Sequence, residues 1–199
     1  MILFRRQMLA GAPVLGAAVL AGCASPPARY YRLAVIPGAT HALSPVTIRV
    51  RSITIPDDLD QNGIAQFSTD YRFATFPNDL WADPLAAMLQ SVMEQDLSQR
   101  LPGAEVIDDG GAVGAPALIR VEMNLLRFDP DPTGAVILSG QVAIRSGENG
   151  GLWDSSGLQA STVPSGVAAL DIVATMSMMW ATVAYRIAVM IAGRCGEPS

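Results

Sequence analysis

Residues 119–125, Ile119-Arg120-Val121-Glu122-Met123-Asn124-Leu125, form the most regular pattern in the chain. Every second residue is apolar and the residues between are polar, which is the period of a β-strand with one buried face. The turn-forming run Asp-Pro-Asp-Pro-Thr-Gly follows at 129–134, and a second apolar stretch returns over 136–145. The pattern therefore predicts two antiparallel strands joined by a tight turn.

Shorter strand-like runs lie on both sides of this pair. Residues 46–50 alternate in the same way, and Ile53 and Ile55 continue the run out of phase, which predicts a β-bulge near Ser52. We expect further strands over 30–35 and 105–107, either a hairpin or two short strands over 64–67 and 71–76, and a weaker strand around Trp153.

Two long segments have helical character. The first starts where Asn78 or Asp79 offers an N-cap and runs to Leu101, before Pro102 and Gly103. The second, 170–192, is apolar on nearly every side. It has two interpretations, a transmembrane helix or a helix buried in the protein. Only 14 uncharged residues separate Asp171 from Arg186, which favours the buried helix.

These elements predict a single α+β domain over residues 30–199. We expect a mostly antiparallel β-sheet with the two long α-helices packed on one face. The chain has 199 residues, of which 50% are hydrophobic and 16% charged. That composition excludes a disordered chain, and the length favours one domain.

The ionisable residues exclude several functions. All 13 basic residues are arginine, 18 residues are acidic, and no basic run with interleaved aromatic residues occurs, so we expect no nucleic acid as a partner. His41 is the single histidine, and we expect it to be exposed in a loop. The sequence therefore predicts no catalytic residues, no metal site and no cofactor. Three aspartates at 57, 58 and 60 lack the spaced ligand set of a calcium loop and indicate a solvated turn instead.

The first 22 residues have the layout of an export signal. Arg5 and Arg6 precede an uncharged, mostly apolar stretch that ends in small residues before Cys23. Residues 20–23, Leu-Ala-Gly-Cys, resemble the bacterial lipobox, in which the cysteine is acylated and becomes the mature N-terminus. The twin arginine is compatible with either the general or the twin-arginine export route. By resemblance to lipoprotein sorting signals, Ala24 favours the outer membrane.

The segment 23–29 is predicted to be a lipidated tether. Six residues, 24–29, separate Cys23 from the first strand, and they span at most about 20 Å. We therefore expect the folded body to lie close to the bilayer. Removal of residues 1–22 leaves 11 basic and 18 acidic residues, a net charge of −7, so lipid rather than charge would hold the protein there.

Several short motifs together resemble the ABC-type transport auxiliary lipoproteins, the family of paraquat-inducible protein C. They are the lipobox, Tyr-Tyr-Arg-Leu at 30–33, Ile-Pro at 55–56 before an acidic turn, and Arg-Phe at 127–128. The most distinctive is Leu-Trp-Ala-Asp-Pro-Leu at 80–85, although the family often has glutamate where this chain has Asp83. The resemblance covers essentially the whole mature chain.

The resemblance implies a non-enzymatic component of an intermembrane lipid transport system at the periplasmic face of the cell outer membrane. Its expected partners are an MCE-domain protein and an inner-membrane permease, with phospholipid as a possible ligand and a homo-oligomeric ring as a possible assembly. The alternative is a stand-alone membrane-anchored module that binds a lipid or another hydrophobic ligand.

Four residues besides the lipidation site Cys23 are candidates for contact with a partner or ligand. Trp81 either packs against the sheet or contacts a partner protein. Met176, Met179 and Trp180 either fill the core or line a lipid-binding groove, since methionine adapts to both settings. The sequence leaves both alternatives open.

Overall fold

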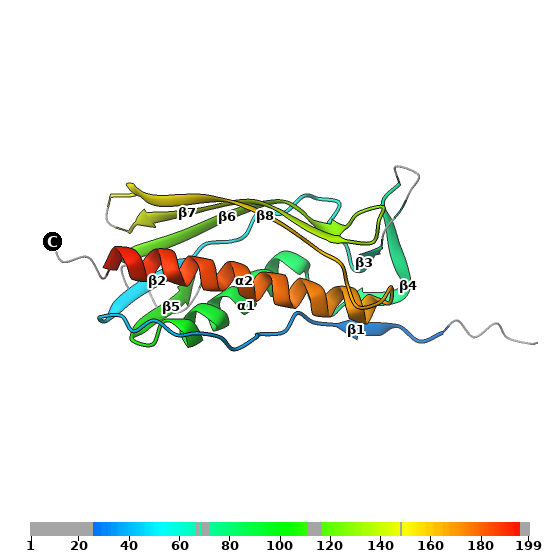
Figure 1. Cartoon of the computed structure of the whole chain (residues 1–199), viewed down its shortest axis with the longest axis horizontal. Helices are drawn as coiled ribbons and strands as arrows, with labels where there is room; N and C mark the ends of the chain where they lie inside the picture. Colours follow the sequence, from blue (N-terminus) through cyan, green and yellow to red (C-terminus); the bar gives the residue numbers. More distant parts are fainter. Residues whose placement is uncertain (1–25, 67, 69–71, 111–116, 148, 196–199) are drawn as a thin grey trace, which may run out of the picture.

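The alternating stretch at 119–125 becomes part of the central strand of a curved sheet (Figure 1). The computed structural model describes residues 26–66, 68, 72–110, 117–147 and 149–195. The predicted signal peptide and Cys23 lie outside these residues. In chain order the elements are β1 (Arg29–Tyr31), β2 (Val46–Val50), β3 (Gly63–Gln66), β4 (Ala74–Trp81), α1 (Leu85–Arg100), β5 (Ala104–Asp108), β6 (Ile119–Pro130), β7 (Val136–Ser146), β8 (Leu152–Thr162) and α2 (Ala169–Cys195).

The larger sheet has the strand order β5-β2-β6-β7-β8. The predicted antiparallel pair is confirmed as β6 and β7, and β8 adds to β7 in the antiparallel sense. In contrast, β2 runs parallel to both β5 and β6. The chain between β2 and β5 contains α1, and parallel neighbours need such a crossover connection. The α+β class is therefore confirmed, with a mixed rather than a mostly antiparallel sheet.

A second, three-stranded sheet, β1-β4-β3, closes one end of the molecule. The predicted hairpin is confirmed as β3 and β4, whereas the predicted start of the first helix is wrong. Asn78 and Asp79 lie in β4, and α1 begins only at Leu85, directly after Pro84. Asp79 caps no helix because its carboxylate binds the guanidinium of Arg29.

The bulge predicted near Ser52 is confirmed by the pairing beside β6. Val50 pairs with Val121, and Thr54 then forms a bridge with Asn124. Four steps along one chain thus match three along the other, so one extra residue is accommodated between them.

Both helices pack on the same face of the larger sheet, as predicted. α1 contacts β2, β5 and α2, while α2 contacts β7 and β8. Trp180 is fully buried at the centre, where its indole Nε1 donates a hydrogen bond to the Leu89 carbonyl at 2.9 Å and its ring lies 5.9 Å from that of Phe128. Among the described residues, α2 is the one helix long and apolar enough to span a bilayer, but 67% of its most apolar window is buried inside the protein. Its apolar composition is thereby explained by its place in the core.

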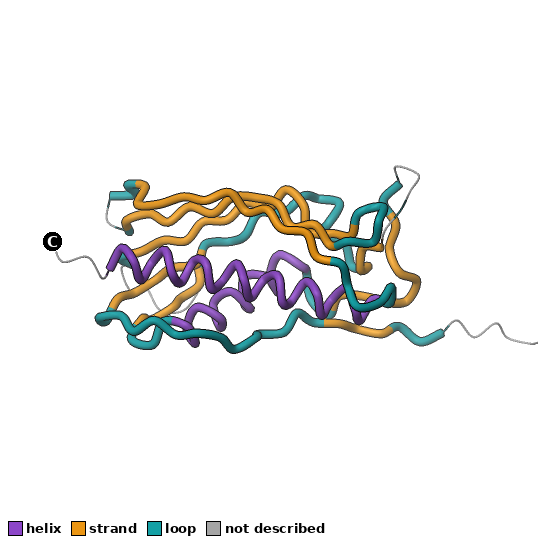
Figure 2. The backbone as a smooth tube through the Cα atoms, in the orientation of Figure 1, coloured by secondary structure: helices purple, strands orange, loops and turns teal. Residues whose placement is uncertain are grey.

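An extended loop over residues 32–45, which we call the strap, runs beside α2 along the length of the molecule (Figure 2). The Ala34 N–H donates to Ser177 Oγ at 3.0 Å, and farther along, the His41 ring lies 5.9 Å from the Tyr185 ring. The expectation that His41 is exposed is wrong, because the side chain is half-buried by this contact. The strap and α2 therefore run in the same direction.

Candidate partner-binding groove

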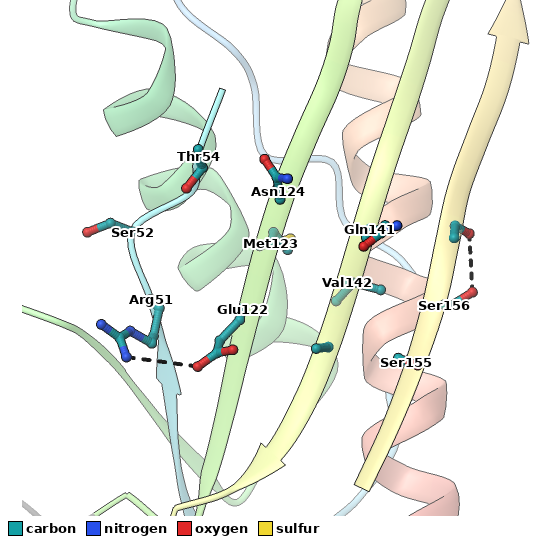
Figure 3. Close-up of a pocket in the computed structure, with 12 residues that line it drawn as sticks. Arg51, Ser52, Thr54, Glu122, Met123, Asn124, Gln141, Val142, Ser155 and Ser156 are labelled. Carbon is teal, nitrogen blue, oxygen red and sulfur yellow. Dashed lines mark hydrogen bonds and ion pairs between the residues drawn. The ribbon is translucent and has the colours of Figure 1, made fainter. Parts of the chain in front are cut away.

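An open groove of about 640 Å³ lies on the face of the larger sheet that the helices leave free (Figure 3). In this view both helices lie behind the strands, and the polar side chains of β6 and β7 in the groove, Glu122, Asn124 and Gln141, point away from them. The groove runs across β6, β7, β8 and the segment after β2. It is lined by Arg51, Ser52, Thr54, Glu122, Met123, Asn124, Gln141, Val142, Ala143, Ser155, Ser156 and Gly157.

The polar lining follows from strand alternation. On β6, Val121, Met123 and Leu125 point into the core, so Glu122 and Asn124 must point to the free face. The same alternation on β7 buries Val142 and exposes Gln141.

Charged side chains meet at one end of the groove. The Glu122 carboxylate accepts a hydrogen bond from Arg145 Nε at 2.8 Å and lies 3.9 Å from Arg51 Nη1. Arg51 also forms an ion pair with Asp109 at 3.3 Å. The network links β6 and β7 with the segments that follow β2 and β5, and both arginines stay partly exposed.

The other end of the groove is neutral. Asn124 and Gln141 present amide groups there, whereas Ser155, level with Glu122 through Ala143, presents its hydroxyl group beside the charged end. These groups donate and accept hydrogen bonds on an open surface, which is typical of a polar protein–protein contact. Within the described ranges, no group of three or more His, Cys, Asp or Glu side chains is arranged to hold a metal ion.

The candidate residues from the sequence lie away from this groove. Trp81, Met176, Met179 and Trp180 are all buried members of the hydrophobic core. Their burial fits the packing role considered for each of them, and contact with a partner or ligand stays a prediction. Cys23 lies outside the described residues.

A separate pair of charged residues holds the first strand against the rest of the protein. Arg29 in β1 forms two hydrogen bonds to the Asp79 carboxylate in β4, at 2.6 and 2.8 Å. The bonds from Arg29 lower the pKa of Asp79, although burial of this carboxyl acts in the opposite direction. β1, which directly follows the predicted tether, is thereby bound to the body of the protein.

Sequence reasoning missed the groove as a site. The alternation at 119–125 indicates that Glu122 and Asn124 share an exposed face. It contains no signal that Arg51, Gln141 and Ser155 come to the same face, because their proximity depends on strand order.

The fold defines a class of protein, a mixed α+β domain whose sheet keeps one polar face open while two helices cover the other. The profile of the family described as "ABC-type transport auxiliary lipoprotein component" matches residues 31–188. The chain therefore belongs to this family, and its membership indicates a membrane-associated location in the cell envelope.

A curated relative agrees with this assignment. The chain is 32% identical over 127 residues to the "Intermembrane transport lipoprotein PqiC" of Escherichia coli strain K12, an alignment that covers 61% of this chain. The alignment spans 66% of the relative, just under two thirds of its length.

Solved structures share the fold. An uncharacterized protein of known crystal structure superposes with a TM-score of 0.69 at 24% identity, covering 83% of this chain and 99% of that one. A protein from Xanthomonas campestris also reaches a TM-score of 0.69, at 15% identity, with 84% and 97% covered. At these identities the likeness concerns the fold alone.

Proposed function

We propose that this protein is a non-enzymatic component of an intermembrane lipid transport system, anchored to the periplasmic face of the outer membrane through Cys23. Its role is to dock the end of a transport conduit at that membrane. The proposed partners are an MCE-domain protein, which contacts the lipoprotein directly, and an inner-membrane permease, which completes the transporter. A homo-oligomeric ring around the conduit is compatible with this role.

The observation that carries the proposal is the open polar groove, present in a chain of the transport auxiliary lipoprotein family. Acyl chains that cross water cost about 0.8 kcal/mol for each exposed methylene, so a lipid conduit needs a close seal at the membrane. A rigid sheet face with fixed arginines and free amide groups provides a surface for such a contact. The proposed tether and the bond between Arg29 and Asp79 would keep the folded body that carries this surface attached close to the bilayer.

A stand-alone lipid-binding module is the second candidate, and a crevice between β8 and α2 favours it. This crevice of about 180 Å³ has Leu138, Leu158, Met179 and Val183 along its walls and the Arg186 guanidinium among its polar groups. An apolar wall beside one cation suits a short length of acyl chain next to an anionic headgroup. Met179 is one of the residues for which the sequence left a lipid-binding groove open.

The test is an in vivo crosslinked pull-down of the full-length tagged protein, followed by mass spectrometry of proteins and lipids. A Gln141→Arg variant introduces a bulky cation into the groove, and Gln95→Arg makes the same change on an exposed position of α1 as the matched control. Cys23→Ala removes the proposed anchor. Because hot-spot contacts lie at the centre of an interface, we expect Gln141→Arg to reduce recovery of an MCE-domain protein by about tenfold or more.

The proposal predicts that the wild-type chain and Gln95→Arg both recover the MCE-domain protein and that Cys23→Ala does not. Recovery of bound lipid without any transport component would instead support the stand-alone module. If Gln141→Arg and Gln95→Arg recovered the partner equally, the groove would not be the docking surface.

A further inference from the structure

Four exposed apolar side chains gather at one end of the molecule. Val163, Val167 and Leu170 are 77%, 75% and 63% exposed, and Tyr30 is 68% exposed. We call these four residues the apolar end patch. Surface residues of this kind are common singly, but a group of them marks an interaction surface.

Pairing and hydrogen bonds place the four residues together. Val163 follows the last residue of β8, and Val167 and Leu170 lie in the connection to α2 and in its first turn. Because the strap runs in the same direction as α2 and Ala34 bonds Ser177, the residues before the strap lie beside the beginning of α2. Tyr30 is among them, and Figure 1 shows β1 next to this end of α2.

The loop that presents the two valines is held in one conformation. The Asp171 carboxylate accepts hydrogen bonds from Ser165 Oγ at 3.1 Å and from the Ala168 N–H at 3.2 Å. A side chain at position 166 would place its Cβ 2.5 Å from Asp171 Oδ2, so any residue other than glycine would displace the carboxylate that holds the loop. The exposure of Val163 and Val167 is thus imposed by an ordered loop.

The loop that contributes Val163, Val167 and Leu170 also lacks charge. No Asp, Glu, Arg or His occurs from residue 155 to residue 170, a run of 16 residues that includes the loop. The carboxylate of Asp171, the first charged group after this run, is engaged by the loop itself. An uncharged apolar loop is unusual on a protein surface in water but common where a protein enters a lipid interface.

The position of the N-terminus identifies the occupant of this patch. Six residues, 24–29, lie between Cys23 and Tyr30, so the two Cα atoms are seven steps and at most about 25 Å apart. The proposed acyl anchor must therefore enter the bilayer beside the patch. Tyr30 has an apolar ring and a polar hydroxyl, a combination enriched at membrane–water interfaces.

We propose that the apolar end patch inserts into the headgroup region of the bilayer that holds acylated Cys23. The inference rests on the anchoring part of the proposed function. Lipidation supplies the affinity, and the patch fixes the orientation, so that the long axis of the molecule points away from the membrane. Asp129 and Asp131 lie at the same end of the sheet as the patch. The turn that contains Asp131 leads into Val136, which pairs with Thr162, the residue before Val163. Arg29 and Arg32 beside Tyr30 are paired with Asp79 and Asp83. The contact is therefore expected with neutral lipid and needs no anionic headgroup.

The test measures depth at one residue of the patch. The full-length chain is purified from membranes as the lipidated protein, verified by mass, and reconstituted on dioleoylphosphatidylcholine vesicles with or without brominated acyl chains. Val167→Trp places a fluorophore in the patch, and Leu152→Trp places one at the opposite end of β8, where the native side chain is also exposed. The emission of the parent protein, with its own three tryptophans, is subtracted.

We expect bromine to quench the emission of Val167→Trp about twofold and to leave Leu152→Trp unchanged, because interfacial side chains lie about 5–10 Å into the headgroup and acyl boundary. Leu170→Trp serves as a second variant in the patch and should behave like Val167→Trp. Absence of quenching in a chain that floats with the vesicles would overturn the inference and leave the anchor intact, with a second copy or a partner protein as the occupant. Equal quenching at both ends would overturn it as well. A chain that is not lipidated or does not float would overturn the anchored function together with the inference.

Discussion

Gly140 on β7 is a position where the larger sheet has no room for a single added carbon. At this point β6 carries a bulge, because Leu125 pairs with Gly140 and Arg127 already pairs with Ser139. The backbone of β6 therefore approaches β7 closely. A Cβ at position 140 would lie against the Asn124 carbonyl oxygen and 2.9 Å from Leu125 Cα. Both neighbours are backbone atoms, which cannot rotate away.

The expected cost of Gly140→Ala follows from that geometry. Carbon atoms in ordinary contact are about 3.5–4.0 Å apart, so β6 or β7 must move by roughly 1 Å. Such overpacking costs about 1–3 kcal/mol, and the lower flexibility of alanine in the unfolded chain returns about 0.5–1 kcal/mol. We expect a net loss of up to about 2.5 kcal/mol in the free energy of unfolding.

Gly157 is a matched control on the next strand. It pairs with Gln141, the neighbour of Gly140, yet a Cβ there would meet no atom within 4 Å. Gly157→Ala should therefore stabilise the protein by about 0.5–1 kcal/mol. Urea unfolding at neutral pH measures both variants. If Gly140→Ala were as stable as Gly157→Ala, the close approach of β6 and β7 would not be rigid and the reasoning would be refuted.

Three further predictions concern buried polar groups. Trp180→Phe removes the hydrogen bond to the Leu89 carbonyl and leaves a small cavity. We therefore expect a loss of about 2 kcal/mol in the free energy of unfolding, measured in urea. An unchanged unfolding midpoint would mean that this contact does not join the helices. Because Arg29 lowers the pKa of Asp79 in the folded state, the stability from this carboxylate is present above its ordinary pKa of 3.8 and is lost as the pH falls through the lower folded value. Urea titrations at decreasing pH should show this loss in the wild type and a smaller one in Arg29→Gln. Burial raises the pKa of Asp96, so its ionisation lowers stability as the pH rises from 3.8 through the raised folded value, and Asp96→Asn should flatten that decline in the same titrations.

Local pattern was sufficient to predict the elements whose partners are close in sequence. The strand at 119–125 and the returning strand over 136–145 share a short turn, so alternation and turn residues alone indicate their pairing. The bulge near Ser52 was predictable for the same reason, because a change of phase in the alternation is visible within a few residues.

The first helix shows where such reasoning fails. Leu80 and Trp81 directly precede a helical stretch. They nevertheless form a parallel pair with β1, which lies 50 residues earlier in the chain. That pairing, together with the bond between Arg29 and Asp79, extends β4 to Trp81 and delays α1 until Leu85. No local propensity contains this information, since it depends on a contact distant in sequence. The groove was missed for a related reason, because β2 joins β6 as a parallel neighbour.

The length of α2 sets the distance between the two ends of the molecule. Its 27 residues extend about 40 Å at 1.5 Å per residue, from the apolar end patch to the exposed, unpaired thiol of Cys195. With the patch at the bilayer, this one helix sets the height at which the opposite end of the lipoprotein stands above the lipid. A fluorophore on Cys195 would read that height directly by energy transfer to a labelled membrane. Lengthening the distal part of α2 by seven residues would raise the end of the helix by about 10 Å without altering the anchored end.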